Sequence, residues 1–389
     1  MPRDSRSRRT ENDLIVGSKA LIKDINRSRI ISEVRSQGPI SRSELSKRIG
    51  LVPSTVSKVC DQLISEGLFY ESGRGESTGG RRPVYLSFDN GYGYVIAVKI
   101  EHNHLVFAVA NLKPFVHETF TSDFALGAPF EDVEQMLMDG IREAESRIPG
   151  VGKRLVGISI AVSGIVDPIS GRLTKSTLLG WQNIDFSSVI GCHYSCPVYV
   201  ENDVNCYALS QNLLGNGRSA RSFCCVTIGE GIGAGLIVDG TLYRGAIGGA
   251  GELGHTIVKG DGEPCDCGQS GCLEAYASSA AIIEAVHRAT GDRLSVESIV
   301  ERARAGDRAC AAALKRAGKA LGWGLVSVVS FFNPEKIIIG GEGVVEKEFI
   351  LPIVQAEIDR NWFSTVGGFH TDIEVDELGN ENFILGAAV

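Results

Sequence analysis

Residues 254–272 read GHTIVKGDGEPCDCGQSGC, and no other stretch of the chain constrains its fold as tightly. The stretch holds four potential metal ligands in the spacing H-x9-C-x-C-x4-C, namely His255, Cys265, Cys267 and Cys272. Three thiolates and one imidazole form the complete tetrahedral shell of a structural zinc ion, with no coordination position left open for water or substrate. The spacing therefore predicts a Zn²⁺ ion that braces a short loop.

Two carboxylates flank the predicted zinc loop. Glu252 precedes His255 by three residues, and Glu274 follows Cys272 by two. A metal that orders the loop would fix both carboxylates in space, and the glycines between the ligands let the loop turn back around one ion. The alternative is three buried thiols beside a surface histidine. Four potential ligands within eighteen residues favour the metal.

Length and composition set outer limits. A chain of 389 residues predicts two or three domains, and an apolar content of 43% is enough for a large core. The chain has no run of eighteen apolar residues, and its basic start, MPRDSRSRRTENDL, lacks the apolar core of a signal peptide. Seven cysteines lie outside the zinc loop, mostly in apolar surroundings, which predicts buried free thiols in a reducing cytoplasm.

Charge is distributed unevenly along the chain. Residues 1–90 hold 16 Lys and Arg against 11 Asp and Glu, a balance of +5 in a chain whose net charge is −8. The remaining residues therefore carry −13. A basic head on an acidic body indicates that only the head approaches a polyanion, although a small domain also reaches such a balance by chance.

The first ninety residues have the pattern of a helix-turn-helix. A first helix is expected to end before the Gly-Pro pair at 38–39, because that pair does not continue a helix. Ser41 and Glu44 form the S-x-x-E of a capping box, which predicts the start of a second helix. Pro53 is a favourable first residue for a third helix, while Val52 holds the preceding position, where Ser or Thr is usual.

A β-hairpin wing follows these helices. Strands are expected over 68–71 and 84–88, joined by the glycine-rich stretch GRGESTGGRRP. The third helix and the wing present small hydroxyl side chains and cations suited to phosphates and base edges of duplex DNA, namely Ser54, Thr55, Ser57, Lys58, Arg74, Arg81 and Arg82. The alternative is a helical interaction or dimerisation module. The capping box, the wing and the arginines together favour DNA binding.

The rest of the chain alternates between apolar, strand-like runs and helical patterns, which predicts an α/β fold. Strands are expected over 94–98, 105–110, 156–162, 198–200, 224–228, 235–238 and 336–339, and helices over 130–147, 204–214, 278–290, 295–305 and 309–332. Two strand-turn-strand units, 94–112 and 223–240, predict a duplicated, two-lobed body with a cleft between the lobes. For the second unit the alternative is an ordinary glycine-rich hairpin.

Polar residues follow one of the predicted buried strands. Residues 201–205 read Glu-Asn-Asp-Val-Asn directly after the apolar run 198–200. The carboxyl end of a strand in an open α/β sheet is a common place for ligands, and amides and carboxylates together suit the hydroxyl groups of a sugar. The sugar shell predicted in this way comprises Asn202, Asp203, Glu252, His255 and Glu274. The alternative, an exposed acidic loop that caps a helix, suits Glu201 best.

These stretches together resemble the ROK family (repressors, open reading frames and sugar kinases) over nearly the whole chain. The resemblance is carried by GISIAVSGIVDPISGRL (157–173), LGWQNID (179–185), VYVENDVNCYAL (198–209), GEGIGAGLIVDGTLYRGAIGGAGELGH (229–255), CDCGQSGCLEAYAS (265–278) and IIIGGEG (337–343). The zinc run and the Glu-Asn-Asp triplet are specific motifs. The glycine turns at 229–233 and 337–343 are common individually.

The resemblance implies a two-lobed, actin-like ATPase body of α/β class behind an N-terminal winged helix-turn-helix, usually in a dimer or tetramer. The expected domains are a flexible arm (1–20), a winged helix-turn-helix (21–90) and a sugar-kinase-like body (91–389), with lobe one at about 91–203 plus the C-terminal segment and lobe two at about 204–375. By position in the family motifs, the sugar shell above contacts the sugar, with Gly164 and Thr177 as further candidates. Because His255 also binds zinc, only its second nitrogen or the loop it anchors faces the sugar.

The stretches that hold ATP in the kinases of this family differ here. Where those kinases have Asp-x-Gly-Gly-Thr, this chain has KIEHN at 99–103, and the usual threonine of the second hairpin is Glu230. Side chains thus replace glycines that let backbone N–H groups close on phosphate, and the charges of Lys99 and Glu230 are wrong for metal and triphosphate. In those kinases the aspartate that matches Asp203 is the base on the sugar hydroxyl.

This combination resembles the transcriptional regulators of the family. The hypothesis is a sugar-responsive repressor of carbohydrate uptake or metabolism genes, without catalytic activity and without a membrane partner. Its partners would be a double-stranded DNA operator, a monosaccharide or sugar-phosphate effector, and further copies of the chain in a homodimer or homotetramer. The alternative is a sugar kinase for a hexose or N-acetylhexosamine with an accessory DNA-binding head, since Asp203 is retained. A zinc-stabilised module without a ligand is a third possibility.

Overall fold

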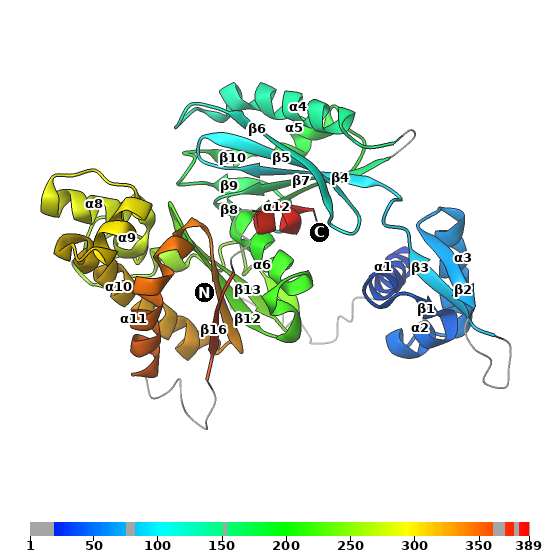
Figure 1. Ribbon diagram of the computed structural model, residues 1–389. Coiled ribbons are helices and arrows are strands. Elements are labelled where there is room, and N and C mark those ends of the chain that lie inside the picture. Colours follow the sequence, from blue (N-terminus) through cyan, green and yellow to red (C-terminus); the bar gives the residue numbers. More distant parts are fainter. Residues whose placement is uncertain (1–18, 75–81, 151–153, 361–369, 377–380, 389) are drawn as a thin grey trace, which may run out of the picture. The chain divides into compact units, whose positions relative to one another are not determined.

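The computed structural model of the protein describes residues 19–74, 82–150, 154–360, 370–376 and 381–388. The chain divides into two compact units, Met1–Tyr92 and Gly93–Val389, which are called the head and the body below (Figure 1). All ten cysteines are free thiols. Of the seven outside the predicted zinc loop, the buried ones are Cys60, Cys206, Cys224, Cys225 and Cys310.

The head packs three helices against a three-stranded antiparallel sheet of order β1-β3-β2. Its elements are α1 (Lys19–Gln37), β1 (Ile40–Ser41), α2 (Arg42–Ile49), α3 (Pro53–Ser65), β2 (Phe69–Arg74) and β3 (Val84–Phe88). The predicted second and third helices and both wing strands are confirmed. Residues 19 and 20, expected to lie in a flexible arm, are helical instead because α1 begins at Lys19, and the rest of that arm lies outside the described residues.

Local sequence chemistry explains the turn between α2 and α3. The Ser41 hydroxyl accepts a hydrogen bond from the Glu44 backbone N–H at 3.2 Å, as the capping-box pattern predicts. Helix α2 ends at Gly50, whose φ of 67° is a conformation that glycine adopts without strain. The Ser46 hydroxyl then donates to the Leu51 carbonyl oxygen at 2.6 Å across the turn. These bonds fix the direction in which α3 starts.

The first lobe of the body is a five-stranded sheet of order β11-β7-β4-β5-β6. Its strands are β4 (Tyr94–Ile100), β5 (His104–Asn111), β6 (Val116–Asp123), β7 (Leu155–Val162) and β11 (Val198–Asn202). Helices α4 (Phe130–Ser146) and α5 (Phe186–Gly191) lie over one face of this sheet (Figure 1). The apolar stripe of α4 packs on β5, where Phe107 and Leu137 are fully buried.

The second lobe repeats this arrangement with strand order β14-β13-β12-β15-β16. Its strands are β12 (Phe223–Ile228), β13 (Ile232–Val238), β14 (Thr241–Tyr243), β15 (Lys336–Gly340) and β16 (Asp372–Val375). In each lobe the first strand is central, with two antiparallel strands on one side and two parallel strands on the other. The predicted duplicated body is therefore confirmed.

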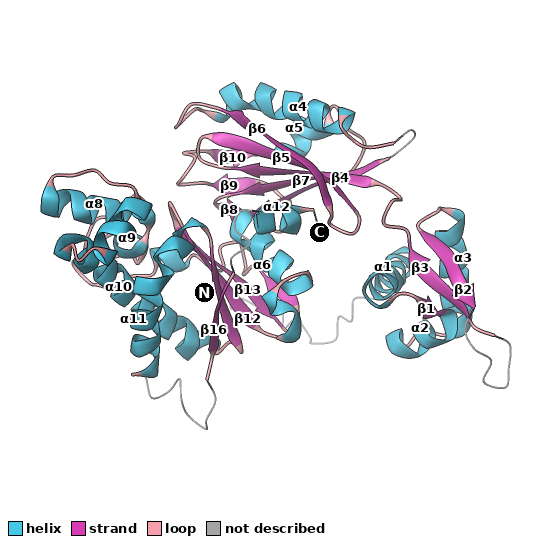
Figure 2. Cartoon of the chain, in the orientation of Figure 1, coloured by secondary structure: helices cyan, strands magenta, loops and turns pink. Residues whose placement is uncertain are grey.

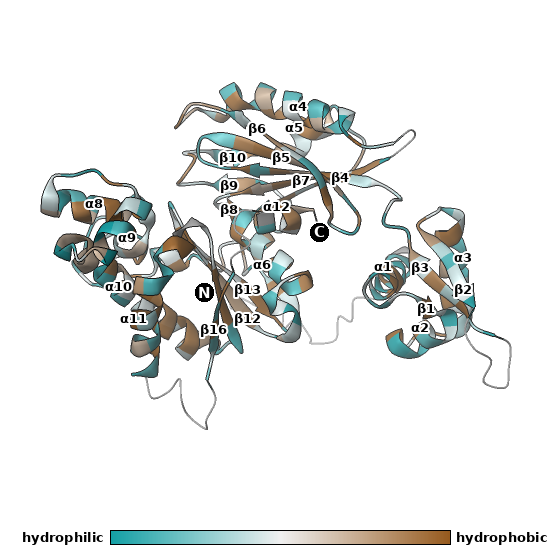
Figure 3. Ribbon diagram, in the orientation of Figure 1, coloured by the Kyte–Doolittle hydropathy of each residue, from teal (hydrophilic) through white to brown (hydrophobic). Residues whose placement is uncertain are grey.

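Helices cover the second lobe and bury its sheet. They are α7 (Glu274–Ala277), α8 (Ser279–Thr290), α9 (Val296–Arg304), α10 (Arg308–Phe332) and α11 (Lys347–Asp359). The long helix α10 lies beside α11 (Figure 2). Strand β12 is buried along its whole length, and Figure 3 shows the strands of this lobe as largely hydrophobic.

Each lobe sends one helix across to the other. Helix α6 (Asp203–Leu213) follows β11 of the first lobe and packs on β12 and β13 of the second. Helix α12 (Glu381–Ala387) follows β16 of the second lobe and packs on β4 and β7 of the first. The two crossing helices also contact each other, so the start of α6 lies where the two lobes meet.

Short elements complete the body. They are β8 (Ile165–Val166), β9 (Leu173–Lys175), β10 (Gln182–Ile184) and single 3-10 turns at Asn216–Ser219, Leu253–His255 and Glu342–Glu346. Strands β8, β9 and β10 form a small antiparallel sheet of their own. Among the described residues, no helix combines the length and the apolar character that a membrane span requires.

One buried carboxylate in the second lobe has no charge partner. The Glu346 side chain is fully buried, and neither of its oxygens has a hydrogen-bond partner in the part of the chain that the structure describes. Burial, with a smaller contribution from the negative charge of Glu297, raises the pKa of Glu346 to about 8. The acid is therefore neutral in the folded protein at pH 7.

We expect Glu346 to make the folded protein less stable as pH rises. Its pKa in the unfolded chain is 4.5, so its contribution to stability is complete below pH 4.5 and is lost as pH rises through about 8. The free energy of unfolding should lose about 2–3 kcal/mol between pH 5.5 and pH 7.5 in urea titrations, and Glu346→Gln should remove that loss. Glu348→Gln, an exposed control on α11, should leave it unchanged. Equal slopes for Glu346→Gln and the wild type would contradict this assignment.

Candidate functional site

The four predicted metal ligands converge in the second lobe. The ligand atoms of His255, Cys265, Cys267 and Cys272 all lie within 4.8 Å of one another. His255 Nδ1 is 3.7 Å from Cys265 Sγ, and Cys267 Sγ is 3.7 Å from Cys272 Sγ. Two thiolates bound to one tetrahedral ion at about 2.3 Å are about 3.8 Å apart, so the cluster has the dimensions of a metal site.

The loop between the ligands is held by its own backbone. Gly271 has a φ of 83°, and a Cβ atom there would lie 1.8 Å from the Lys259 carbonyl oxygen, so only glycine fits. The Tyr276 hydroxyl accepts the Glu263 N–H at 2.8 Å. Burial raises the pKa of Cys272, so this thiol stays protonated unless a cation stabilises its thiolate. The donor set and its spacing therefore fit a bound metal ion.

Asn202 and Asp203 lie at the junction of β11 and α6. The side-chain oxygen Oδ1 of Asn202 caps α6 by accepting the Asn205 backbone N–H at 3.0 Å. The side-chain nitrogen Nδ2 of Asn202 donates to the Gly164 carbonyl oxygen at 3.0 Å. The remaining amide hydrogen of Asn202 is available for a ligand. Gly164 has a φ of 122°, and a Cβ there would lie 2.4 Å from the Lys175 carbonyl oxygen. Gly164 thus supports Asn202 through its backbone.

Glu201 is fully engaged in the structure. It accepts hydrogen bonds from the Asn202 N–H and the Asn205 side chain, each at 2.9 Å, and pairs with Arg244 Nε at 2.6 Å. Since Arg244 belongs to the second lobe and β11 to the first, this ion pair joins the lobes. Glu201 is therefore a part-buried residue of β11 that links the lobes, and not the exposed helix cap that the sequence favoured, because the N-cap of α6 is Asn202.

The other predicted sugar residues approach this junction from the second lobe. Burial raises the pKa of Glu252, the charges of Asp203 and Glu274 raise it further, and the charge of His255 opposes these shifts. Because His255 Nδ1 faces the thiols, its Nε2 atom faces Glu252, with 4.0 Å between Nε2 and Oε2.

Two further sugar candidates, Glu274 and Thr177, have different surroundings. One oxygen of Glu274 accepts the Ile232 N–H at 2.9 Å and so ties the metal loop to the β12–β13 hairpin. Thr177 is exposed, in the turn between β9 and β10. Glu274 therefore has one oxygen left for a ligand.

A buried lysine occupies the first hairpin. Lys99 is 5% exposed. Its ammonium nitrogen lies 2.5 Å from Glu101 Oε1 and 3.9 Å from the centre of the Phe383 ring. Burial raises the pKa of Asp203, and the charge of Lys99 opposes that shift. The sequence indicated an unusual cation at this position. The sequence did not indicate Phe383 as its neighbour, because α12 is short and lies far from Lys99 along the chain.

The second hairpin faces a hollow of about 210 Å³ that Glu230 and Glu274 line. Arg288 and Arg316 also line it, but both pair with Glu263, at 2.9 and 3.2 Å. The lining holds five acidic residues, Glu230, Glu263, Asp266, Glu274 and Glu284, against these two arginines, so its charge is net negative. Such a wall attracts a polyphosphate weakly.

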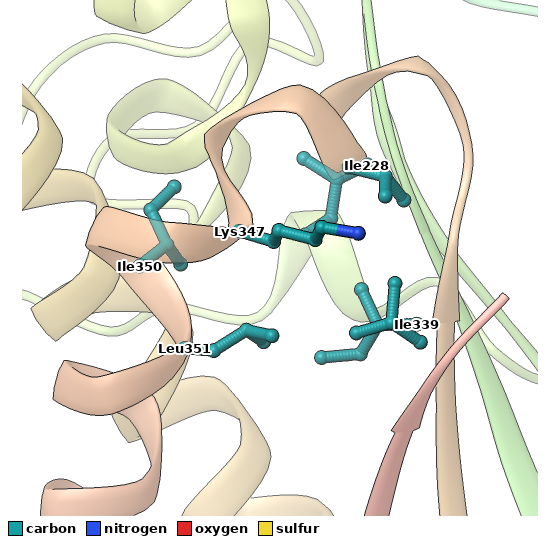
Figure 4. A pocket seen from close by; sticks show the side chains of 7 residues that line it. Ile228, Ile339, Lys347, Ile350 and Leu351 are labelled. Carbon is teal, nitrogen blue, oxygen red and sulfur yellow. The ribbon is translucent and has the colours of Figure 1, made fainter. Parts of the chain in front are cut away.

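A second cavity lies beside the glycine turn at 337–343. Its volume is about 10 Å³, which is room for about one water molecule. The wall is almost entirely apolar and consists of Ile228, Ile339, Val344, Lys347, Ile350, Leu351 and Val375 (Figure 4). A purine base does not fit in this space.

The predicted DNA-binding residues lie on α3 and on the wing. Ser54 and Lys58 are exposed on α3, whereas Thr55 and Ser57 are half-buried. The wing candidates Arg74 and Arg82 are exposed at the two ends of the hairpin connection, while Arg81 lies outside the described residues. The opposite face of α3 carries the predicted apolar stripe, and Val56, Val59, Cys60 and Leu63 are buried.

The body and the head each match a known protein family. Residues 95–389 match the ROK family, and residues 23–69 match the winged helix-turn-helix DNA-binding family. A xylose repressor of Caldicellulosiruptor bescii is 31% identical over 95% of this chain and 96% of its own length. The transcriptional dual regulator NagC of Escherichia coli is 27% identical over 92% of this chain and 90% of its own.

Solved structures show the same fold. A ROK family transcriptional regulator, a homolog of the E. coli MLC protein, superposes with a TM-score of 0.83 at 27% identity, covering 94% of this chain and 95% of its own. A ROK glucokinase of Streptomyces griseus, solved with glucose and AMPPNP, gives 0.65 at 26% identity over 76% of this chain and 98% of its own. The expected winged head and sugar-kinase-like, actin-like body are confirmed.

Loss of one thiolate should release the metal. We expect the purified protein to hold about one metal ion per chain by elemental mass spectrometry, and Cys267→Ser to hold well under half of that, because a three-ligand shell binds far more weakly. The variant should also melt at a lower temperature. Cys196→Ser, outside the cluster, is the matched control and should keep both properties. An unchanged metal content in Cys267→Ser would show that this thiol is not a ligand.

Proposed function

The chain belongs to the ROK family, and from that premise we propose that it is a sugar-responsive, DNA-binding repressor of carbohydrate uptake or metabolism genes. Relatives that match almost its whole length are named as repressors of xylose or N-acetylglucosamine genes. Its head matches a DNA-binding family. The proposed partners are a double-stranded operator and a monosaccharide or sugar-phosphate effector.

One contrast supports this proposal: polar groups suited to a sugar are present, while the residues of the phosphate hairpins differ from those of kinases. Asn202 and Asp203 stand at the start of α6, and Glu252 Oε2 lies 4.0 Å from Nε2 of His255, one of the four clustered metal-ligand candidates. On the phosphate side, the buried Lys99–Glu101 ion pair fills the first hairpin and Glu230 adds a negative charge to the second. Loops that bind phosphate through backbone N–H groups need glycines and a nearby cation. Here other side chains stand at the glycine positions of the first hairpin, and the Lys99 cation is paired with Glu101.

We propose that the metal is Zn²⁺ with a structural role. A shell of three cysteines and one histidine is typical of zinc, and four protein ligands leave no position for a reacting water. Bound zinc would supply rigidity and would fix Nε2 of His255 beside Glu252. The sugar would then meet a preformed set of hydrogen-bonding groups.

We propose that sugar binding changes the relative position of the lobes, and with it the spacing of two heads in a homodimer or homotetramer. The Glu201–Arg244 ion pair and the crossing helices α6 and α12 join the lobes next to the proposed sugar site. A repressor dimer binds two half-sites whose separation must match its heads. Coupling requires only that the sugar prefer one arrangement, typically by about 1–3 kcal/mol.

A sugar kinase with an accessory DNA-binding head is the second candidate. The observation that favours it is Asp203, which occupies the position of the kinase base and lies in an environment that raises its pKa. A base with a raised pKa suits proton transfer from a hydroxyl group. Against it stand the altered phosphate hairpins and the small apolar cavity beside the glycine turn at 337–343.

The proposal predicts that a simple sugar changes DNA affinity and that Asp203 is needed for this. A duplex selected by the full-length protein from a random library would be titrated by fluorescence anisotropy. The titration would be repeated with D-xylose, D-glucose, N-acetyl-D-glucosamine and the 6-phosphates of the last two. One of these should change the affinity about tenfold or more. Asp203→Asn should keep DNA binding but need roughly tenfold or more sugar, because a charged acceptor is lost.

Asp239→Asn is the matched control, because Asp239 is an exposed surface residue paired with Arg221. This variant should respond like the wild type. If none of these sugars alters DNA affinity, the proposed effector class is wrong. If the protein selects no duplex at all, the proposed DNA-binding function is wrong.

A further inference from the structure

Helix α3, the second helix of the helix-turn-helix, has no side-chain N-cap, like α4, α7 and α11 and unlike α2, α5, α6, α8, α9 and α10. Val52 is its N-cap residue, in an extended conformation, and makes no side-chain hydrogen bond to the first turn. By contrast, Ser41 caps α2 and Ser278 caps α8 through their hydroxyl groups. A hydroxyl at the N-cap satisfies a backbone N–H that otherwise has no partner in the helix, so valine makes the start of α3 less stable than serine would.

Packing does not account for the valine either. The Val52 side chain is 62% exposed. The structure describes all of Arg42–Ser65, and within this range Val52 is the only large apolar side chain that is exposed. Pro53 beside it is also exposed, and the other exposed residues of α3, namely Ser54, Lys58, Asp61 and Ser65, are polar. An apolar group therefore stands at the tip of a polar, hydrogen-bonding surface.

The helix-turn-helix gives this tip a specific neighbour when it binds DNA. The N-terminal residues of the second helix contact base edges in the major groove. Valine neither donates nor accepts a hydrogen bond, so it can distinguish bases only through apolar contact. In the major groove the C5-methyl group of thymine is the apolar feature that differs between base pairs.

We propose that Val52 is a specificity-determining residue that contacts the C5-methyl group of one thymine in each operator half-site. This inference rests on the proposed DNA-binding function and adds a named residue and a named base feature to it. In this proposal, α3 lacks a side-chain N-cap because Val52, at the N-cap position, contacts a base instead. Ser54 and Lys58 would contact phosphates or polar base edges beside it.

The alternative is that Val52 is exposed without consequence, since single apolar residues are common on protein surfaces. The two accounts differ in what Val52→Ser does. Under our proposal, the substitution makes α3 more stable and at the same time removes a base preference. A residue without a role in recognition would give the first effect without the second.

The test uses the full-length protein and the duplex that it selects from a random library. Each thymine of that duplex is replaced in turn by deoxyuridine, which lacks only the C5-methyl group, and affinity is measured by anisotropy at fixed salt. We expect the wild type to lose about fourfold in affinity at one position per half-site, the effect of one buried methyl group. Val52→Ser should be indifferent to that replacement, whereas Val52→Ile should remain sensitive.

Hydrogen exchange of the peptide that covers α3 provides the second readout. We expect slower exchange in Val52→Ser than in the wild type, which would show that loss of the methyl preference is not caused by unfolding of the helix. The inference is overturned if every deoxyuridine duplex binds the wild type within twofold of the parent. It is also overturned if Val52→Ser keeps the same sensitivity. Failure to select any duplex would instead reject the DNA-binding function, and this inference with it.

Discussion

The body depends on the close packing of its two crossing helices. At the point of contact Gly386 of α12 lies against the backbone of α6, and a Cβ atom there would come within 1.7 Å of the Cys206 carbonyl oxygen. The Asp376 carboxylate, just before α12, accepts hydrogen bonds from Tyr207 and Gln211 of α6, both at 2.9 Å, and from Asn382 at 2.5 Å. These donors compensate the cost of burying its charge.

This contact connects the ligand cleft to both lobes. Helix α6 begins at Asp203, so the proposed sugar residue stands at one end of the crossing helix. At the other helix, the Phe383 ring stacks on Tyr207 with 5.1 Å between ring centres and also lies under the Lys99 ammonium. Lys99 in turn pairs with Glu101 on the first hairpin. A structural change at the proposed sugar residues would therefore act on the closely packed contact between α6 and α12, which both lobes share.

The elements that the sequence predicted correctly are those whose structure depends on residues close together in the chain. The metal ligands lie within one short loop, helix α2 of the head has its own cap and ends at a glycine, and the duplicated hairpins show as apolar runs around a turn. Strand β6 was missed because it is an edge strand with an exposed, polar face. Helix α12 was missed because it is too short to show periodicity, and its position follows from tertiary packing.

The same distinction holds for the candidate site. Asn202 and Asp203 were predictable as polar residues at the carboxyl end of a strand, although β11 is a part-exposed edge strand and not the buried strand that was expected. Their neighbours Arg244 and Phe383 come from distant segments that only the fold brings together. The phosphate hairpins could be compared with those of kinases residue by residue, but no sequence pattern indicates that the Lys99 ammonium is buried against Glu101 and an aromatic ring.

The central claim is that the cleft binds a sugar without transferring phosphate to it. Titration calorimetry with the effector sugar, with MgATP, and with both together tests this most directly, when the mixture is also analysed for sugar phosphate. We expect heat from the sugar alone, no saturable heat from MgATP, and no sugar phosphate after prolonged incubation. Saturable binding of MgATP together with steady formation of a sugar phosphate would contradict it.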